Sequence, residues 1–597
     1  MCGIAGIYAY GAASPEVDET ELIRIRDRMV ARGPDGVGLW LHPYRRVGLA
    51  HRRLAIIDLH ARALQPMHFA GDDLTIVFNG EIYNYQTLRA EIEQSGFHHF
   101  RTASDTEVLL ALYARYGAGM LDRLRGMFAF AIHDRRNDTL FLARDPYGIK
   151  PLYFSNESGA FRFASSVKAL IAGGGISHDR DPAGLVGFQL LGSVPEPFTI
   201  YRAVSALPAG SHMTVGGGGA GKPIRWASIA ARLSDARAAH EPVDAVVAQA
   251  ALDSVRAHMV ADVEVGTFLS AGTDSGALLG LMRDAGASRV RAITIGFEEL
   301  IGTPADEVPI ASEVARHYGA EHHVETITRQ DFADALPQIL DAMDQPSIDG
   351  INSWFVSRAA SKLGLKVVLS GLGGDELLAG YSTFSSVPRT RRLARLMGTV
   401  PFAGPLARSA ATTLVPGWAA RNPKALGVLQ FGRSWAGAYL LRRAVLLPSE
   451  LSASLDDDVV REGLTRLRPL DCIADTMRPD PKSDIARVAA LETSNYMRNQ
   501  LLRDSDWASM AHSLELRTPL VDWELLRQIA PVTAKLASGA GKAALAKAPS
   551  RPLPRACSDR ARTGFTVPIG QWLNPRQDAP SRLDSRAWSS EVAQAFA

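Results

Sequence analysis

The chain opens with Met1-Cys2-Gly3-Ile4, and the segment from Gly3 to Tyr10 predicts a strand. If Met1 is removed, Cys2 carries both a thiol and a free α-amine. A thiol titrates near pH ~8.5 and an α-amine near ~8, so the amine can accept the thiol proton close to neutral pH. The opening therefore predicts a nucleophile with its own base. Taken alone, so short a motif more often marks a processed terminus with an incidental cysteine.

The composition is that of a globular chain without a polyanionic partner. Its 597 residues are 46% hydrophobic and 21% charged, enough for at least two domains with cores of their own. Lys and Arg number 65 against 63 Asp and Glu, so the charge does not indicate nucleic acid or an anionic membrane. Cys2, Cys472 and Cys557 form no CxxC pair, which favours a reducing cytoplasm without disulfides or zinc. We expect neither a signal peptide nor a membrane span.

Six short motifs follow one another in the first 150 residues. One contains Asn79-Gly80, a pair that usually marks a hairpin turn but that also offers an amide and a backbone N–H to a developing oxyanion. Another, Ser104-Asp105, predicts the start of a helix. In order, the motifs are Cys2-Gly3-Ile4, Arg32-Gly33-Pro34-Asp35, His51-Arg52-Arg53-Leu54, Asn79-Gly80-Glu81-Ile82-Tyr83-Asn84, Ser104-Asp105 and Arg144-Asp145.

This ordered set resembles the class II glutamine amidotransferase domain, over residues 2 to about 200. The resemblance implies an N-terminal-nucleophile hydrolase, with two stacked, mainly antiparallel sheets between layers of helices. It implies that Cys2 attacks the side-chain amide of glutamine and that Asn79 and Gly80 form the oxyanion hole. The glutamine site that it implies comprises Arg53, Leu54, Ala55, Ile56, Ile57, Asn79, Gly80, Glu81 and Asp105.

Three of those residues have charged roles by resemblance. Arg53 holds the α-carboxylate of glutamine, which a guanidinium can bind with two hydrogen bonds. Glu81 and Asp105 hold its α-ammonium. Read singly, Arg53 is more simply a surface ion pair and Asp105 a helix N-cap. The order of the six motifs favours the binding roles.

In the second half, two glycine-containing loops each follow a predicted strand. Val263–Leu269 runs into Ser270-Ala271-Gly272-Thr273-Asp274-Ser275-Gly276 and an Ala- and Leu-rich helix. Val367–Ser370 runs into Gly371-Leu372-Gly373-Gly374-Asp375-Glu376. A strand, a small-residue loop and a helix N-terminus form an anion site, and ligands bind at the carboxyl ends of parallel strands. The alternation from Ala251 to Gly380 predicts a doubly wound α/β sheet.

Both loops are similar to those of the asparagine synthetase domain. So are Asp344-Gln345-Pro346, the segment from Ser509 to Pro519, and Gly564-Phe565, so the resemblance covers nearly the whole chain. That family adenylates a carboxylate with ATP and passes ammonia to it. The ATP site implied by resemblance comprises Leu269, Ser270, Gly272, Asp274, Ser275, Ile295, Ser370 and Gly371. Without the resemblance, the first loop is a tight strand–helix turn with Asp274 as its N-cap.

Cations are also implied by this resemblance. Asp274 and Asp375 hold Mg²⁺ on the phosphates. Arg562 falls where the family has a lysine that neutralises the leaving pyrophosphate, and it joins Cys2, Asn79 and Gly80 as a catalytic residue. Residues 384–480 read as helical and Arg-rich, and we assign them no chemistry.

Three positions depart from the family pattern. Ala271 replaces a residue that is usually Gly, and its methyl group is tolerated only if φ is negative. Leu372 replaces a Glu implicated in forming the aminoacyl-adenylate. Arg562 replaces Lys, which keeps the charge but changes the geometry. We still predict adenylation despite these departures, but they leave the identity of the carboxylate acceptor open.

We therefore predict a glutaminase domain over residues 2–210, an ATP-binding synthase domain over residues 240–575 and a tail over residues 576–597. The first has an αββα sandwich and the second a doubly wound parallel α/β fold. The expected cofactors are ATP and Mg²⁺. The expected partners are small molecules, with no nucleic acid and no membrane, and a homodimer is the oligomer considered.

The predicted activity is that of a glutamine-dependent asparagine synthetase. Glutamine and aspartate would give asparagine and glutamate, and ATP would give AMP and pyrophosphate. An alternative in the same class amidates another carboxylate: a sugar uronate, a peptide side chain or a secondary metabolite. Two further alternatives are a non-enzymatic regulator that binds nucleotide or glutamine, and a hydrolase domain joined to a sugar- or phosphoribosyl-transferase. The intact set around Cys2 disfavours the regulator, and the loop at Ser270–Gly276 disfavours the transferase.

Overall fold

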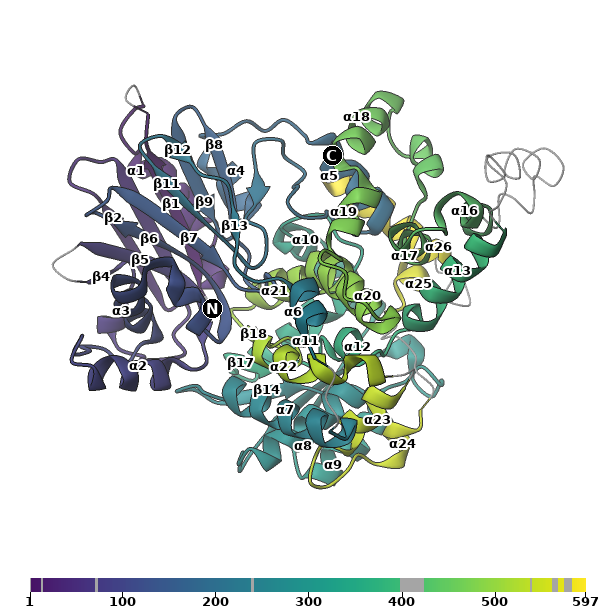
Figure 1. Cartoon of the computed structure of the whole chain (residues 1–597). Coiled ribbons are helices and arrows are strands. Elements are labelled where there is room, and N and C mark those ends of the chain that lie inside the picture. The colour runs from purple at the N-terminus through teal and green to yellow at the C-terminus, as the bar shows by residue number, and fades with distance from the viewer. Residues whose placement is uncertain are drawn as a thin grey trace.

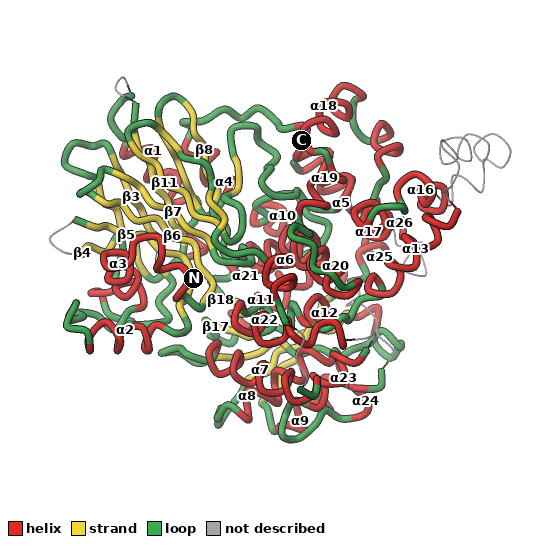
Figure 2. The backbone as a smooth tube through the Cα atoms, viewed as in Figure 1, coloured by secondary structure: helices red, strands yellow, loops and turns green. Residues whose placement is uncertain are grey.

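Two antiparallel sheets form the first half of the chain and a parallel sheet forms the second (Figure 1). The computed structural model describes residues 2–11, 14–69, 73–237, 241–397, 423–536, 539–560, 567–573 and 582–596. Figure 2 shows the strands of the first half gathered on the left and a largely helical region on the right.

The two sheets of the first half have six and seven strands. The first contains, in spatial order, β10 (Ser205–Ala206), β8 (Tyr153–Glu157), β9 (Ala160–Ala164), β1 (Gly3–Ala9), β3 (Val47–Arg53) and β2 (Gly36–Leu41). The second contains β12 (Gly219–Ala220), β11 (Ser211–Gly216), β7 (Thr139–Arg144), β6 (Gly126–Asp134), β5 (Leu74–Ile82) and β4 (Met67–Phe69), with β13 (Ile224–Arg225) paired to β11.

Helices cover the outer faces of both sheets. Buried side chains of β1, including Ile4 and Tyr8, pack between the sheets against Val77 and Ala131 of the second sheet. Alternate residues of β1, such as Ile7, face the opposite layer. That layer consists of α1 (Glu19–Asp27) and α4 (Val167–Gly173), and the second sheet is covered by α2 (Tyr85–Gln94) and α3 (Asp105–Tyr116). The αββα sandwich predicted for this half is confirmed.

The parallel sheet runs in the order β16-β15-β14-β17-β18, with crossovers on both sides of β14. Its strands are β16 (Glu321–Ile327), β15 (Arg291–Phe297), β14 (Val265–Phe268), β17 (Val367–Leu369) and β18 (Glu515–Arg517). Val367 and Leu369 face one helical layer, whereas Val368 faces the other. Strands buried on both faces are typical of a doubly wound sheet, so this prediction is also confirmed.

The helices of the two layers come from distant parts of the chain. One layer contains α7 (Val243–His258), α8 (Thr273–Asp284), α9 (Val308–Tyr318) and α23 (Ala540–Lys547). The other contains α10 (Arg329–Ala342), α11 (Ile351–Lys362) and α21 (Arg503–Met510). Within the described residues, no helix is long and apolar enough to span a bilayer.

Where the structure describes it, the region between β17 and β18 is largely helical, as expected for residues 384–480; residues 398–422 of that range lie outside the described residues. Its helices include α12 (Gly374–Leu377), α13 (Thr383–Met397), α16 (Pro423–Phe431), α17 (Trp435–Arg443), α18 (Asp457–Leu467), α19 (Pro469–Asp475) and α20 (Asp484–Leu491). One of them, α18, packs on α5 (Pro182–Leu191) of the first half. A π-helical segment, η6 (Glu492–Leu502), then leads into α21 and β18.

Candidate active sites

Cys2 lies immediately before β1 and is buried, with 8% of its surface exposed. Its backbone N–H donates to Asn79 Oδ1 at 2.9 Å, and its carbonyl oxygen accepts from Arg32 Nε at 3.2 Å. Burial raises the pKa of the Cys2 thiol above its ordinary value. A thiol in this position needs a base beside it to become a nucleophile.

Asn79 and Gly80 lie inside β5 and not at a turn. A Cβ on residue 80 would lie 2.1 Å from the carbonyl oxygen of Met127, so the approach of β6 leaves room only for glycine. Asn79 uses its Oδ1 on Cys2, whereas its Nδ2 is buried and has no hydrogen-bond partner among the described residues. An amide donor held beside the nucleophile in this way is what an oxyanion hole requires.

The cavity beside Cys2 is small, with a volume of about 30 Å³. It is lined by Cys2, Arg53, Leu54, Ile56, Ile57, Ala63, Gln65, Phe78, Gly80, Glu81, Ser104, Asp105, Thr106 and Glu515. Of the predicted glutamine-binding residues, only Ala55 and Asn79 do not line it. A volume near that of one water molecule in the liquid cannot hold glutamine, so its walls must move for substrate to enter.

The charged residues of this cavity have defined partners. Arg53 donates to the carbonyl oxygens of His60 and Ile57, at 3.1 and 3.3 Å, and so holds the turn that forms one wall. Asp105 is the first residue of α3, and Ser104 is the N-cap. The Asp105 carboxylate accepts from the N–H of Ile82 at 3.1 Å, and burial raises its pKa to about 6.

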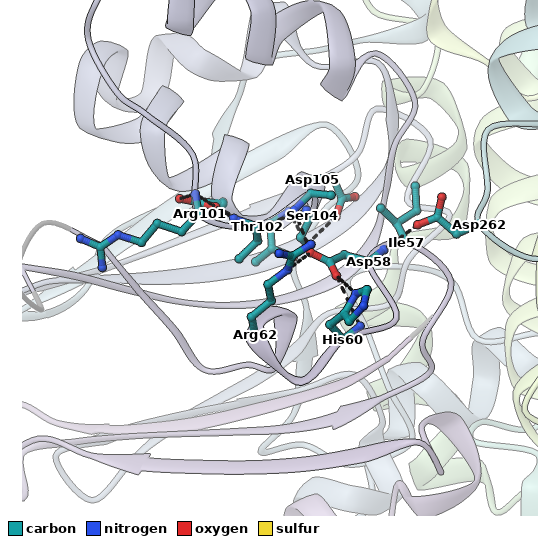
Figure 3. A network of polar contacts seen from close by, with 12 residues as sticks. Ile57, Asp58, His60, Arg62, Arg101, Thr102, Ser104, Asp105 and Asp262 are labelled. Carbon is teal, nitrogen blue, oxygen red and sulfur yellow. Dashed lines mark hydrogen bonds and ion pairs between the residues drawn. The ribbon is translucent and has the colours of Figure 1, made fainter.

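A network around Asp58 joins the two walls of the cavity (Figure 3). Its carboxylate accepts from the N–H of Ala103 at 2.7 Å and faces His60 Nδ1 at 3.0 Å and Arg62 Nε at 3.1 Å. Its own N–H donates to Asp262 Oδ2 at 2.8 Å. Because Asp262 lies just before β14, the wall of the glutamine cavity is tied to the second half.

A buried ion network, contributed largely by β18, also crosses between the halves. Arg517, which has no exposed surface, donates through Nε to Glu515 at 2.6 Å and lies 3.2 Å from Glu81. Burial and the charge of Asp105 raise the pKa of Glu81. Burial also acts to raise the pKa of Glu515, but positive charges outweigh it, the chain's α-amine first and then Arg517 and Lys150, and lower that pKa to about 2. Glu81, a predicted glutamine-binding carboxylate, is therefore paired with Arg517 of the second half.

A second cavity, of about 840 Å³, opens at the carboxyl ends of the parallel strands. All the residues predicted to bind ATP line it, together with Asp375 and Leu372. The first loop leads from β14 to α8, whose N-cap is Gly272. Ser270 Oγ and Ser275 Oγ are 2.9 Å apart and close the loop on itself. The size and the helix N-terminus suit a nucleotide polyphosphate.

Asp274 and Asp375 converge on one point, and Lys542 of α23 occupies it. Its Nζ is 2.5 Å from Asp274 Oδ2 and 2.7 Å from Asp375 Oδ1. Burial alone would lower the pKa of Lys542, but the two carboxylates raise it. The described residues hold no group of three or more His, Cys, Asp or Glu side chains arranged for a metal. Two carboxylates fit Mg²⁺, which commonly takes its other ligands from phosphates and water.

The three departures from the family pattern have different outcomes. Ala271 is buried and is not among the residues with positive φ, so its methyl group causes no backbone strain. Leu372 lines the large cavity and places an apolar side chain there. Arg562 lies outside the described residues, as do Gly564 and Phe565.

Sequence reasoning missed three charged residues at these sites. Glu515 and Arg517 alternate with Leu516, and two opposite charges within a three-residue buried strand were a signal of a buried ion pair. Lys542 gave no such signal, because a single lysine in an Ala-rich segment normally lies on a solvated helix face. It lies 268 residues from Asp274 in the chain, so only the fold brings them together.

The comparisons with known proteins agree with this arrangement. A family model described as "Glutamine amidotransferase domain" matches residues 1–225, and one described as "Asparagine synthase" matches residues 247–593. "Asparagine synthetase [glutamine-hydrolyzing] 1" of Bacillus subtilis is 31% identical over 96% of this chain and 88% of its own length. A putative asparagine synthetase of Mycobacterium tuberculosis is 33% identical with the same coverage.

"Asparagine synthetase B" of Escherichia coli is 31% identical over 66% of this chain and 67% of its own length. The N-terminal nucleophile, the sandwich around it and the parallel sheet with its two loops occur here in one chain. This chain belongs to the glutamine-hydrolysing asparagine synthetase family, and it is a carbon–nitrogen ligase that takes its nitrogen from glutamine.

Proposed function

We propose that this enzyme hydrolyses glutamine at Cys2 and uses the ammonia to amidate a carboxylate that ATP has activated as an acyl-adenylate. The observation that carries the proposal is the pairing of a buried Cys2, next to a free amide donor of Asn79, with a large cavity at the loops of Asp274 and Asp375. Aspartate is the first acceptor to consider, with asparagine as the product.

At the first site, we propose that removal of Met1 exposes the α-amine of Cys2. The amine takes the thiol proton, the sulfur attacks the glutamine amide carbon, and Asn79 and Gly80 donate to the oxyanion. Collapse of the tetrahedral adduct releases ammonia, with the proton returned by the amine, and leaves a thioester. Water then cleaves the thioester to glutamate. Arg53 binds the substrate's α-carboxylate, and Glu81 and Asp105 bind its α-ammonium.

At the second site, the acceptor carboxylate attacks the α-phosphorus of ATP and pyrophosphate leaves. Ser270, Gly272 and Ser275 hold the pyrophosphate portion, and Leu269, Ile295, Ser370 and Gly371 hold the adenosine. Asp274 and Asp375 would hold Mg²⁺, which neutralises phosphate charge. Lys542 then shares those carboxylates or moves to the phosphates, and Arg562 is the second proposed cation. Ammonia attacks the acyl carbon, and AMP leaves with the amide formed.

Product analysis with purified protein tests this reaction. Glutamate, AMP and pyrophosphate formed in equal amounts, together with one amide, would support it. ADP in place of AMP would overturn the adenylate step. We also propose the cytoplasm as the compartment and a homodimer as the assembly; sedimentation velocity tests the latter.

A second candidate changes only the acceptor. Leu372 lines the cavity where the family pattern has a carboxylate, and Leu501 lines the same cavity. Neither leucine can pair with the α-ammonium of aspartate, although Asp349 and Asp504 line the same cavity, so a sugar uronate, a peptide side chain or a secondary-metabolite acid is the alternative. Pyrophosphate release from ATP across a panel of carboxylic acids distinguishes the two. Rescue of an asparagine auxotroph would favour aspartate.

A further inference from the structure

A third cavity, of about 510 Å³, lies between the two halves of the chain. We call it the interdomain cavity. None of the residues lining it lines the glutamine cavity or the ATP cavity. Its charged lining comprises Arg28, Arg32, Arg144, Lys168, Arg498, Arg503, Asp341, Asp344 and Asp506. The six cations outnumber the three carboxylates, so the lining carries a positive excess.

Most of these charges are accounted for by partners in the described chain. Arg32 pairs with Asp506 at 2.7 Å, and Arg28 pairs with Asp341. Arg144 pairs with Glu196, at 2.7 Å, from the segment that connects the halves. The remaining carboxylate, Asp344, accepts two N–H groups from the start of α4. Lys168 donates to the carbonyl oxygens of Leu340 and Asp341 near the end of α10.

Arg498 and Arg503 differ from the other arginines of this lining. Neither has a carboxylate within 4.0 Å among the described residues. Arg498 donates to the carbonyl oxygen of Tyr147 at 3.1 Å, and Arg503 donates through Nη1 to that of Val194 at 2.7 Å. The one carboxylate near both, Glu196, is paired with Arg144. Two guanidinium groups therefore face this cavity without a counter-charge of their own.

Donors in this lining are also left without acceptors. Arg503 is 9% exposed, and its Nη2 is buried with no hydrogen-bond partner. Trp354, 2% exposed, lines the same cavity with its Nε1 equally unpartnered. An unpaired buried charge costs several kcal/mol, so natural proteins seldom keep one without a compensating ion. Burial and the positive charges of Arg144 and Arg225 also lower the pKa of Arg498, although Glu196 acts in the opposite direction.

We propose that Arg498 and Arg503 form a binding site for an oxyanion group, a carboxylate or a phosphate, of a small molecule in the interdomain cavity. Two guanidinium forks match the planar or tetrahedral arrangement of such oxygens, and the unpartnered indole of Trp354 belongs to the same lining. The cavity volume falls in the range of small-molecule sites. Because lining residues come from both halves, the bound anion would link them.

Binding measurements with the full-length protein test this site. L-glutamate and inorganic phosphate are titrated separately by calorimetry and by thermal shift, at an ionic strength held constant with chloride. We expect saturable binding of at least one of them to the wild-type protein. Arg503→Met and Arg498→Met should each weaken that binding at least about tenfold, which is one charge-assisted pair. The matched control, Arg461→Met, removes an exposed arginine outside the cavity and should leave it unchanged.

The variants also separate this site from the two active sites. Without anion, Arg503→Met should melt no lower than the wild type, because it removes an uncompensated buried charge. Arg503→Lys keeps the charge, should fold, and should bind more weakly than the wild type but better than Arg503→Met. Absence of binding by the wild type, or equal binding by Arg498→Met, Arg503→Met and the wild type, would overturn the proposal. Glutamate binding that persists in both variants belongs to the glutamine site and counts against it. None of these readouts requires catalysis, so they stand apart from the proposed reaction.

Discussion

The proposed glutamine site and the proposed ATP site differ in size and in the parts of the chain that line them. The first is small, with about 30 Å³ beside Cys2, and its carboxylates are held in an ion network that includes Glu515 and Arg517 of the other half. The second is large, with about 840 Å³, and the residues lining it all come from the synthase half. A site proposed for one amino acid can be small, whereas a site proposed for ATP and an acceptor acid needs room. The small cavity therefore has a lining residue and an ion partner from the synthase half, whereas no residue of the hydrolase half lines the large one.

The largest expected effect is the loss of glutaminase activity when Cys2 is replaced. Cys2→Ala should lower glutaminase activity at least about a thousandfold, because the nucleophile is removed. Amide formation from added ammonia should remain within about twofold of the wild type, since no part of Cys2 lines the ATP cavity. Cys472→Ala, which removes a partly buried thiol elsewhere, is the control. Loss of the ammonia-dependent reaction in Cys2→Ala would show that the two sites are not separable.

The next largest effect is expected on ATP–pyrophosphate exchange when Lys542 is replaced. Lys542→Met leaves Asp274 and Asp375 facing each other without their shared cation, so ATP–pyrophosphate exchange should fall about a hundredfold. Glutaminase activity should change little. The control is Lys547→Met, on the same helix, whose lysine is exposed and pairs with Asp244. Unchanged exchange in Lys542→Met would mean that this lysine has no part in nucleotide binding.

A third variant tests whether the glutamine site depends on Arg517 of the synthase half. Arg517→Met removes the cation that faces Glu515 and Glu81, so the free energy of unfolding should fall by about 3–5 kcal/mol. The KM for glutamine should rise although Arg517 belongs to the synthase half. Urea denaturation and glutaminase kinetics measure the two effects, with the exposed Arg527→Met as control. Destabilisation without any change in KM would limit Arg517 to a structural role.

The smallest expected effect is a dependence on pH of the KM for glutamine. The pKa of Asp105 is raised by burial from 3.8 to about 6, so its carboxyl is neutral below that pH and charged above it. The KM for glutamine should therefore rise as pH falls through about 6, by up to about tenfold per pH unit, because the α-ammonium loses its counter-charge. The KM for ATP, measured with ammonia as nitrogen source, should not show this rise below about pH 6. A flat glutamine profile between pH 5 and 7 would contradict the role of Asp105.

The fold could be predicted from the sequence to the level of its layers. The segment from Gly3 to Tyr10 and the apolar runs before the two glycine loops predicted strands of the sheets, because a strand buried on both faces has a nearly continuous apolar sequence. The start of α3 was also visible in Ser104-Asp105, and Ser104 is its N-cap. Asn79-Gly80 was less informative as a local signal, since it lies within β5 and its meaning depends on Cys2, 77 residues away.

Site residues could be predicted from the sequence only where they belong to a recognisable motif. The residues expected to bind ATP all line one cavity because they follow the parallel strands β14 and β17 or, in the case of Ile295, lie within the neighbouring strand β15. Lys542 and Arg517 could not be placed, because nothing local distinguishes a lysine or arginine in a buried network from one in solvent. Their positions follow from long-range packing of α23 on α8 and of β18 on β17.

The location of β18 late in the chain has a consequence for synthesis on the ribosome. Residues 1–225 emerge first and contain Cys2, Asn79 and the rest of the nucleophile's own machinery. Glu81 and Asp105 then face each other until Arg517, close to the far end of the polypeptide, is translated and docked. With the roles proposed for Glu81 and Asp105, a nascent amino-terminal half would bind glutamine poorly, so hydrolysis would wait for the half that receives the ammonia.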